Sequence, residues 1–124
     1  MMTEFSARAV ARLRDEDLGA DVLVLAEHED GSGRRLELQR SLEVTDEDRR
    51  LGMDTFCLVN ETGSVHYGGV EEWSLIDSEL RLKLTDEAAA AMHVDGGYRI
   101  SLIADATEPD VVAHNVAAII GDRL

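Results

Sequence analysis

The residue types that could carry out nucleophilic chemistry are few, and the best pair among them is Cys57 and His66. A hairpin that closes around Glu61-Thr62 places these two residues opposite each other. Their Cβ atoms would then be about 5 Å apart, near enough for the imidazole to lower the pKa of the thiol. Asp54 is close enough in sequence to orient the ring. The alternative is a small buried cysteine beside a surface histidine, because one different residue in the turn would destroy this register.

Metal and phosphate sites are not indicated by the remaining polar residues. His28-Glu29-Asp30 lacks the spaced acids of a calcium loop, and Gly68-Gly69 has no Lys placed to meet a phosphate. Paired glycines in a strand more often mark a bulge or a close backbone approach. We therefore expect no catalytic residue, no metal ligand and no cofactor. A single cysteine cannot build a zinc ribbon. The histidines lie in separate elements, without HxH or HExxH spacing between them: His28, His66, His93 and His114.

The charge balance is strongly acidic, with 26 acidic residues against 12 basic ones and a formal net charge of −14. Nucleic acids and anionic membranes need Lys and Arg to neutralise them, so we expect neither as a partner. A basic protein would be steered toward such a surface and would associate faster. The alternative is that the acidity only keeps the protein in solution.

The length of 124 residues is typical of one domain, and no linker or repeat divides residues 1–124. The lone Cys57 cannot form an internal disulfide, which excludes a stapled secreted scaffold. The first residues have no basic segment followed by an apolar one, and no apolar run approaches the length of a membrane span. The expected location is the cytoplasm.

Turn residues divide the chain into short elements that predict an α+β fold. The order βββ-α-βββ-α-β-α predicts a mostly antiparallel sheet of about seven strands with two or three short helices packed on it. The opening segment alternates weakly, and its Ala and Arg content also favours a helix. Strands are expected at residues 5–12, 22–26, 36–42, 55–59, 64–75, 80–84 and 98–103, and helices at 45–52, 85–93 and 109–120.

Two strand patterns indicate how many faces are buried. The continuous apolar run from Val22 to Ala26 is typical of a strand that is buried on both faces. The alternation of Leu80 to Leu84 predicts a strand that is buried on one face. Helix ends are marked by the capping residues Thr45 and Thr85, and by a Pro at position 109 and a Gly at position 121.

Several segments together resemble immunity protein family ten of the bacterial polymorphic toxin systems. The most specific are Leu51-Gly52-Met53-Asp54-Thr55 and Tyr67-Gly68-Gly69-Val70, and the resemblance covers nearly the whole chain. It implies a small cytosolic protein, typically encoded beside a toxin, that neutralises that toxin by direct binding. Many such toxins are basic nucleases, to which an acidic partner is electrostatically suited, although the family does not fix the toxin's activity.

The resemblance implies no catalytic residues. The segments that match the family contain the residues that we would expect first at a surface that binds a partner. Tyr, Trp and Arg are common interface hot spots, whereas Trp73 could equally be a core residue. An edge strand could also pair with a second copy of the chain. The rival hypothesis is a small enzyme or small-molecule-binding domain that uses Cys57 and His66 near Gly68-Gly69. The candidate partner-binding residues are Gln39, Arg40, Asp54, Thr55, His66, Tyr67 and Trp73.

Overall fold

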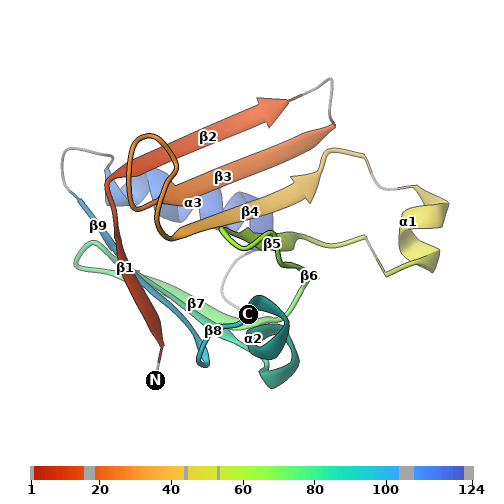
Figure 1. Ribbon diagram of the computed structural model, residues 1–124. Helices are drawn as coiled ribbons and strands as arrows, with labels where there is room; N and C mark the ends of the chain where they lie inside the picture. Colours follow the sequence, from red (N-terminus) through yellow and green to blue (C-terminus); the bar gives the residue numbers. More distant parts are fainter. Residues whose placement is uncertain (1, 16–18, 44, 53, 104–107, 122–124) are drawn as a thin grey trace.

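The computed structural model describes residues 2–15, 19–43, 45–52, 54–103 and 108–121. Within these ranges the element order is ββββ-α-ββββ-α-β-α (Figure 1). The strands are β1 (Thr3–Ala7), β2 (Ala9–Asp15), β3 (Ala20–Ala26), β4 (Arg35–Ser41), β5 (Cys57–Asn60), β6 (Val65–Tyr67), β7 (Val70–Ile76), β8 (Glu79–Leu84) and β9 (Gly97–Leu102). The helices are α1 (Asp46–Arg50), α2 (Asp86–Met92) and α3 (Pro109–Ile120).

The predicted α+β class is confirmed, but the strands form two sheets instead of one. A five-stranded sheet has the order β2-β3-β4-β5-β6, and all of its pairs are antiparallel. A four-stranded sheet has the order β1-β9-β8-β7, in which β1 and β9 are parallel. Figure 1 shows the five-stranded sheet above the four-stranded one, with α3 behind β3 and β4.

Two of the expected strands are each divided in the structure. The expected strand at residues 5–12 becomes β1 and β2, which pair in different sheets on either side of Arg8. The expected strand at residues 64–75 becomes β6 and β7, separated by Gly68 and Gly69. Both glycines have positive φ (66° and 88°), so the backbone turns there between the two sheets.

The reason for a glycine at position 69 is a close approach, as the sequence predicts. A Cβ atom on Gly69 would lie 2.5 Å from the Cβ of Ala88 in α2 and 3.0 Å from the ring of His66. The carbonyl of Gly69 accepts a hydrogen bond of 2.9 Å from the backbone N–H of Thr85. The missing side chain therefore lets α2 pack against the junction between β6 and β7.

The helix ends form at the residues that the sequence marks. Thr45 and Asp48 make a capping box, with reciprocal side-chain to backbone hydrogen bonds of 3.0 Å. Thr85 caps α2 through its hydroxyl, and α3 begins with Pro109 and ends at Gly121 with φ of 105°. The caps at Thr45 and Thr85 satisfy backbone N–H groups that the first turns leave free, whereas α3 begins without a side-chain cap hydrogen bond.

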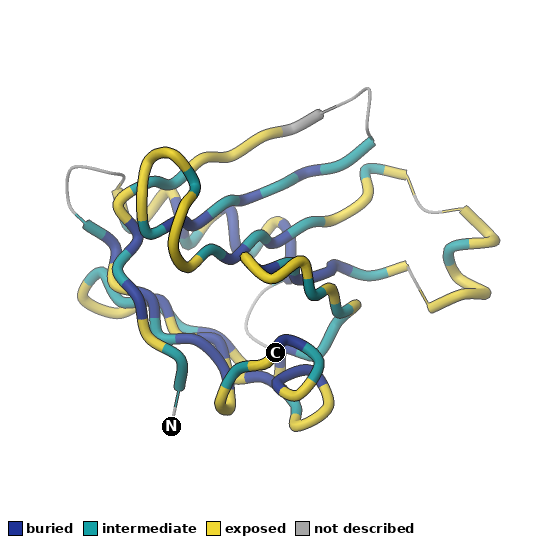
Figure 2. The backbone as a smooth tube through the Cα atoms, viewed as in Figure 1, coloured by how far each residue is buried: buried dark blue, intermediate teal, exposed yellow. Residues whose placement is uncertain are grey.

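The hydrophobic core lies between the two sheets and α3, and Figure 2 shows the buried stretches facing one another there. The alternation of β8 is confirmed: its three leucines are buried and the residues between them are exposed. Leucines of β3, β4 and β5 cover the inner face of the five-stranded sheet, and α3 packs on it. The largest fully buried side chains include Leu23, Leu25, Leu36, Leu38, Leu58, Leu80, Leu82, Tyr98, Ile100, Val112 and Ile119.

Candidate partner-binding surface

The hairpin formed by β5 and β6 has a different register from the predicted one. Cys57 stands opposite Tyr67, and His66 stands opposite Leu58. Adjacent positions of a strand point to opposite faces, so Cys57 and His66 lie on different faces of the sheet. The predicted pairing of these two side chains is therefore wrong.

The turn that joins these strands explains the shift. Asn60 donates its backbone N–H to the carbonyl of Ser64 (3.2 Å), and Gly63 donates to the carbonyl of Asn60 (3.0 Å). The loop thus consists of Glu61, Thr62 and Gly63, with Gly63 in the left-handed region at φ of 80°. A type I turn followed by a left-handed glycine is a common hairpin connection, and it adds one residue to the loop that the sequence suggests.

The surroundings of Cys57 do not activate a thiol. Burial raises the pKa of Cys57, and the negative charge of Glu37 raises it further. The Sγ atom lies 3.9 Å from Oε1 of Gln39, a weak donor contact. His66, on the other face, has its Nδ1 atom 3.3 Å from the carbonyl oxygen of Gly68. The rival hypothesis of a thiol enzyme at this position therefore loses its geometric basis.

Gln39, Cys57 and Tyr67 instead form one row across three adjacent strands. Gln39 pairs with Cys57, and Cys57 pairs with Tyr67, so the three side chains share the face of the five-stranded sheet that points away from the core. We call this the outer face. By the same registers it also carries Ala9, Ala11 and Leu13 of β2, Ala20, Val22, Val24 and Ala26 of β3, Arg35, Glu37 and Ser41 of β4, Val59 of β5 and Val65 of β6.

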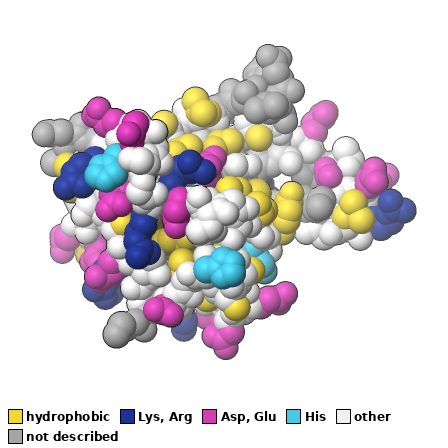
Figure 3. All heavy atoms as spheres, viewed as in Figure 1, with side chains coloured by type: hydrophobic (Ala, Val, Ile, Leu, Met, Phe, Trp, Pro, Cys, Tyr) yellow, Lys and Arg dark blue, Asp and Glu magenta, His cyan; other side chains and the backbone are white. Residues whose placement is uncertain are grey.

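The outer face is mainly apolar and open to solvent. Leu13 is 56%, Val65 51% and Tyr67 40% exposed, and Val22, Val24 and Val59 are half-buried. Figure 3 views this side of the molecule and shows apolar side chains over β2 to β5. Among the residues that the structure describes, no helix or strand packs on this face.

The corresponding face of the four-stranded sheet is charged. Arg99 forms an ion pair with Glu4 (2.8 Å), and Arg81 forms one with Glu79 (3.2 Å). Lys83 lies 3.5 Å from Glu71. Charged side chains on a solvated sheet face are ordinary, whereas a contiguous apolar face marks an interaction surface. The outer face carries one such ion pair, between Arg35 and Glu37 (3.2 Å), among mostly apolar side chains, so the two outward faces differ in their apolar content.

Two of the seven candidate residues hold α3 in place. Arg40 donates from its guanidinium to the carbonyl of Ile119 (2.9 Å), and Trp73 donates from Nε1 to the carbonyl of Gly121 (3.0 Å). These residues come from different sheets, so together they fasten the end of the helix to both. A cation near the last carbonyls also interacts favourably with the helix dipole. Trp73 is only 9% exposed, which fits the alternative that it packs in the core.

The other candidates occupy different places. Gln39 and Tyr67 lie on the outer face, whereas His66 lies on the opposite face of the sheet, beside Gly69. Asp54 is exposed and Thr55 is half-buried, in the segment that leads from α1 into β5. Figure 1 shows this segment and α1 extending beyond the sheets, and none of the residues in α1 is buried.

The sequence-based candidates did not include the valines of the outer face. The strand that contains Val22 and Val24 was expected to be buried on both faces, but the structure buries Leu23, Leu25 and Ala26 and leaves the two valines half-buried. Val59 and Val65 flank the turn of the next hairpin. The signal that could have found these residues is the excess of apolar side chains over what one core face requires.

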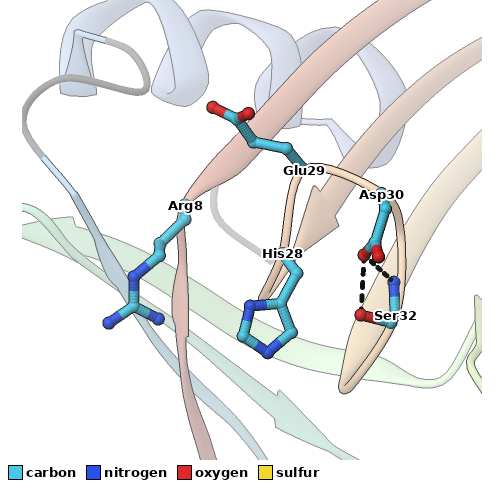
Figure 4. Close-up of a pocket in the computed structure, with 5 residues that line it drawn as sticks. All are labelled: Arg8, His28, Glu29, Asp30 and Ser32. Carbon is cyan, nitrogen blue, oxygen red and sulfur yellow. Dashed lines mark hydrogen bonds between the residues drawn. The ribbon is translucent and has the colours of Figure 1, made fainter.

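Small-molecule and metal sites are weakly developed in the described parts of the chain. A hollow of about 550 Å³ lies between Arg8 and the β3–β4 loop (Figure 4). Its lining residues are all exposed, and Arg8 and Glu29 point away from one another. Ser32 donates two hydrogen bonds to the carboxylate of Asp30, which lowers the pKa of that group. No cluster of three or more metal-ligating side chains occurs among the described residues, and none of their helices is long and apolar enough to cross a membrane.

Comparison with known proteins identifies one family. The family model described as Immunity protein 10 matches residues 6–111, which is most of the chain. This confirms the resemblance seen in the sequence. The comparison with curated proteins gave no match. The matched range contains every strand of the five-stranded sheet, and with them the complete outer face.

Proposed function

The chain belongs to the immunity protein 10 family, and we propose that it neutralises a toxin protein by binding that toxin directly through the outer face. It acts by occupying the toxin and catalyses no reaction. We place this encounter in the cytoplasm of the cell that makes both proteins.

The observation that carries this proposal is the open side of β3. Its leucines, Leu23 and Leu25, have no exposed area and fill the core, whereas Val22 and Val24 on the other side remain half-exposed. A strand that is apolar on both faces is normally covered on both. Burying apolar surface stabilises a complex by roughly 25 cal/mol per Å² before the costs of association. A protein partner on the outer face would bury the exposed area of these two valines.

The charge of the chain supports a basic partner. A net charge of −14 produces a negative potential that attracts a positively charged protein and raises the association rate. Nuclease toxins suit this description because they must attract nucleic acid phosphates. Contacts with the apolar outer face would then provide the affinity of the complex, while long-range charge attraction raises the association rate.

The experiment is co-purification of this chain with the toxin domain encoded beside it, followed by kinetics at low and high salt. We expect a stable complex whose association rate falls roughly tenfold or more at high salt, because salt screens steering. Loss of toxicity on co-expression is the functional readout. A wild-type chain that neither binds nor protects would refute the proposal.

A matched pair of variants tests the surface. Val65→Asp adds a charge at an exposed position of the outer face, and Ile76→Asp adds the same charge at a position of β7 that is 64% exposed. Both variants have the same net charge, so they change steering by similar amounts. Only Val65→Asp should weaken the complex. Equal binding by both variants would place the contact elsewhere.

A further inference from the structure

The edge of the five-stranded sheet formed by β2 differs from the other sheet edges. Within the described part of the chain, β2 is hydrogen-bonded on one side only, to β3. It has seven residues and pairs with β3 without a register shift. By contrast, β6 has three residues, β1 has five, and the β7 edge has a register shift between Val70 and Glu72. Short strands and bulges protect edges from pairing, and β2 has neither protection along its length.

The hydrogen-bonding phase of the sheet shows which backbone groups reach the free edge. Glu27 donates to Arg34 (2.9 Å) and Leu42 donates to Gly19 (2.7 Å), so the odd-numbered residues of β3 turn their backbone groups to β4. The even-numbered residues of β3 then face β2, where they stand opposite residues 9, 11, 13 and 15. The N–H and C=O groups of Val10 therefore point away from the sheet, and those of Arg12 do the same.

The side chains of β2 hold this edge in an extended form. Arg12 donates to both carboxylate oxygens of the buried Asp21 (3.2 and 3.0 Å) and to Oδ1 of the buried Asn115 (2.8 Å). This network ties β2 to β3 and α3 from the inner side. On the outer side, Ala11 and Leu13 are exposed and continue the outer face to the edge, where Figure 2 shows β2 as an exposed stretch.

We propose that the toxin binds by adding an extended segment to the free edge of β2, as a further strand of the five-stranded sheet. The inference rests on the proposed function and states how the toxin is held. Main-chain hydrogen bonds to Val10 and Arg12 supply affinity, as in other cases of strand addition. The added strand would carry apolar residues on the side that extends the outer face, and acidic or polar ones near the exposed Arg8.

The distribution of arginines argues that the added strand is not the β2 of a second copy. Arg8 and Arg12 both lie at even positions along this segment. Antiparallel pairing of two copies about residue 10 would put Arg8 opposite Arg12, and pairing about residue 12 would put the two Arg12 residues opposite each other. Like charges that stand directly opposite each other destabilise a strand pair. A heterologous segment avoids this repulsion.

The test uses two variants at one position, with the toxin domain as the probe. Val10→Pro removes the outward N–H and leaves the β2–β3 ladder intact, because proline is tolerated in an edge strand where its nitrogen faces solvent. Val10→Ala removes most of the side chain and keeps the N–H. We expect Val10→Pro to weaken binding at least tenfold more than Val10→Ala does, as for loss of a main-chain hydrogen bond.

Hydrogen exchange of the wild-type complex gives a second readout that does not depend on a variant. We expect the amides of Val10 and Arg12 to become protected when the toxin domain binds. A complex in which these amides exchange as in the free protein, or one that binds Val10→Pro and Val10→Ala equally, would overturn the strand-addition inference alone. Protection of these amides in the free chain at high concentration would point to self-pairing and overturn it too. Failure of the wild-type chain to bind the toxin would instead refute the proposed function and this inference with it.

Discussion

Cys57 stands directly opposite Tyr67 on the outer face, with Gln39 on its other side. The thiol therefore belongs to a row of side chains on the proposed binding surface and has no base beside it. Its burial and the nearby Glu37 both favour the protonated form and raise its pKa. Because the thiolate is the reactive form of cysteine, the thiol of Cys57 should react slowly.

The first prediction concerns Cys57. Alkylation of the folded protein near neutral pH should be much slower than that of a free thiol, and unfolding should restore the ordinary rate. The raised pKa means that the unfolded state loses the thiol proton at a lower pH than the folded state. Stability should therefore fall as pH rises above the ordinary thiol pKa, and Cys57→Ala should remove that part of the dependence. Fast alkylation of the native protein would contradict the structure.

The second prediction concerns Tyr67, the aromatic residue of the row, which is 40% exposed. Tyr67→Ala should weaken toxin binding by about 2 kcal/mol or more, which is roughly 30-fold in Kd, if the ring is an interface hot spot. Tyr67→Phe keeps the ring and should lose little. Val111→Ala, at a residue of α3 that is 49% exposed, is the control and should leave Kd unchanged. Calorimetric titration with the toxin domain would measure all three.

The third prediction separates folding from binding at Arg40 and Trp73. Arg40→Ala leaves the carbonyl of Ile119 without its guanidinium donor, and should lower the free energy of unfolding by about 1–3 kcal/mol. Trp73→Phe should cost a similar amount, because the carbonyl of Gly121 loses its indole donor. Arg81→Ala, at an exposed ion pair, should change stability by less than about 1 kcal/mol.

Urea unfolding measures these differences in stability. Binding should be compared without urea, at a temperature at which each variant is folded. We expect Arg40→Ala to retain the wild-type Kd, because its guanidinium faces α3. A large loss of affinity in a folded Arg40→Ala protein would show that this residue also contacts the toxin.

The fourth prediction compares two glycines with similar backbone angles. Gly63 and Gly69 have φ of 80° and 88°, but only at Gly69 would a Cβ atom meet other atoms within 4 Å. Gly63→Ala should therefore cost about 1 kcal/mol, the penalty of a left-handed alanine. Gly69→Ala adds the clash with Ala88 and should cost clearly more. Thermal unfolding of the two variants gives the comparison, and equal losses would mean that α2 can move away.

Much of the local structure could be predicted because the signals are local. Thr45 and Thr85 cap helices through their own hydroxyl groups, and the alternation of Leu80, Leu82 and Leu84 reflects the two-residue period of a strand. The glycine pair indicated a bulge or a close backbone approach, and the structure shows the close approach at Gly69. The family resemblance followed in the same way, from short segments.

The exposed apolar face on which the proposal rests could be identified only from the tertiary structure, because burial depends on what distant parts of the chain supply. The apolar run from Val22 to Ala26 specifies a strand with two apolar faces, but only the packing of α3 decides which face the chain covers itself. The three-residue loop that ends at Gly63 sets a register in which Cys57 stands opposite Tyr67 and not opposite His66. Arg40 and Trp73 were chosen by residue type, and their roles were decided by the carbonyl groups of α3, which lie far away in the sequence. The sequence by itself thus determined the elements and their apolar content, whereas the fold decided which apolar surface stays exposed.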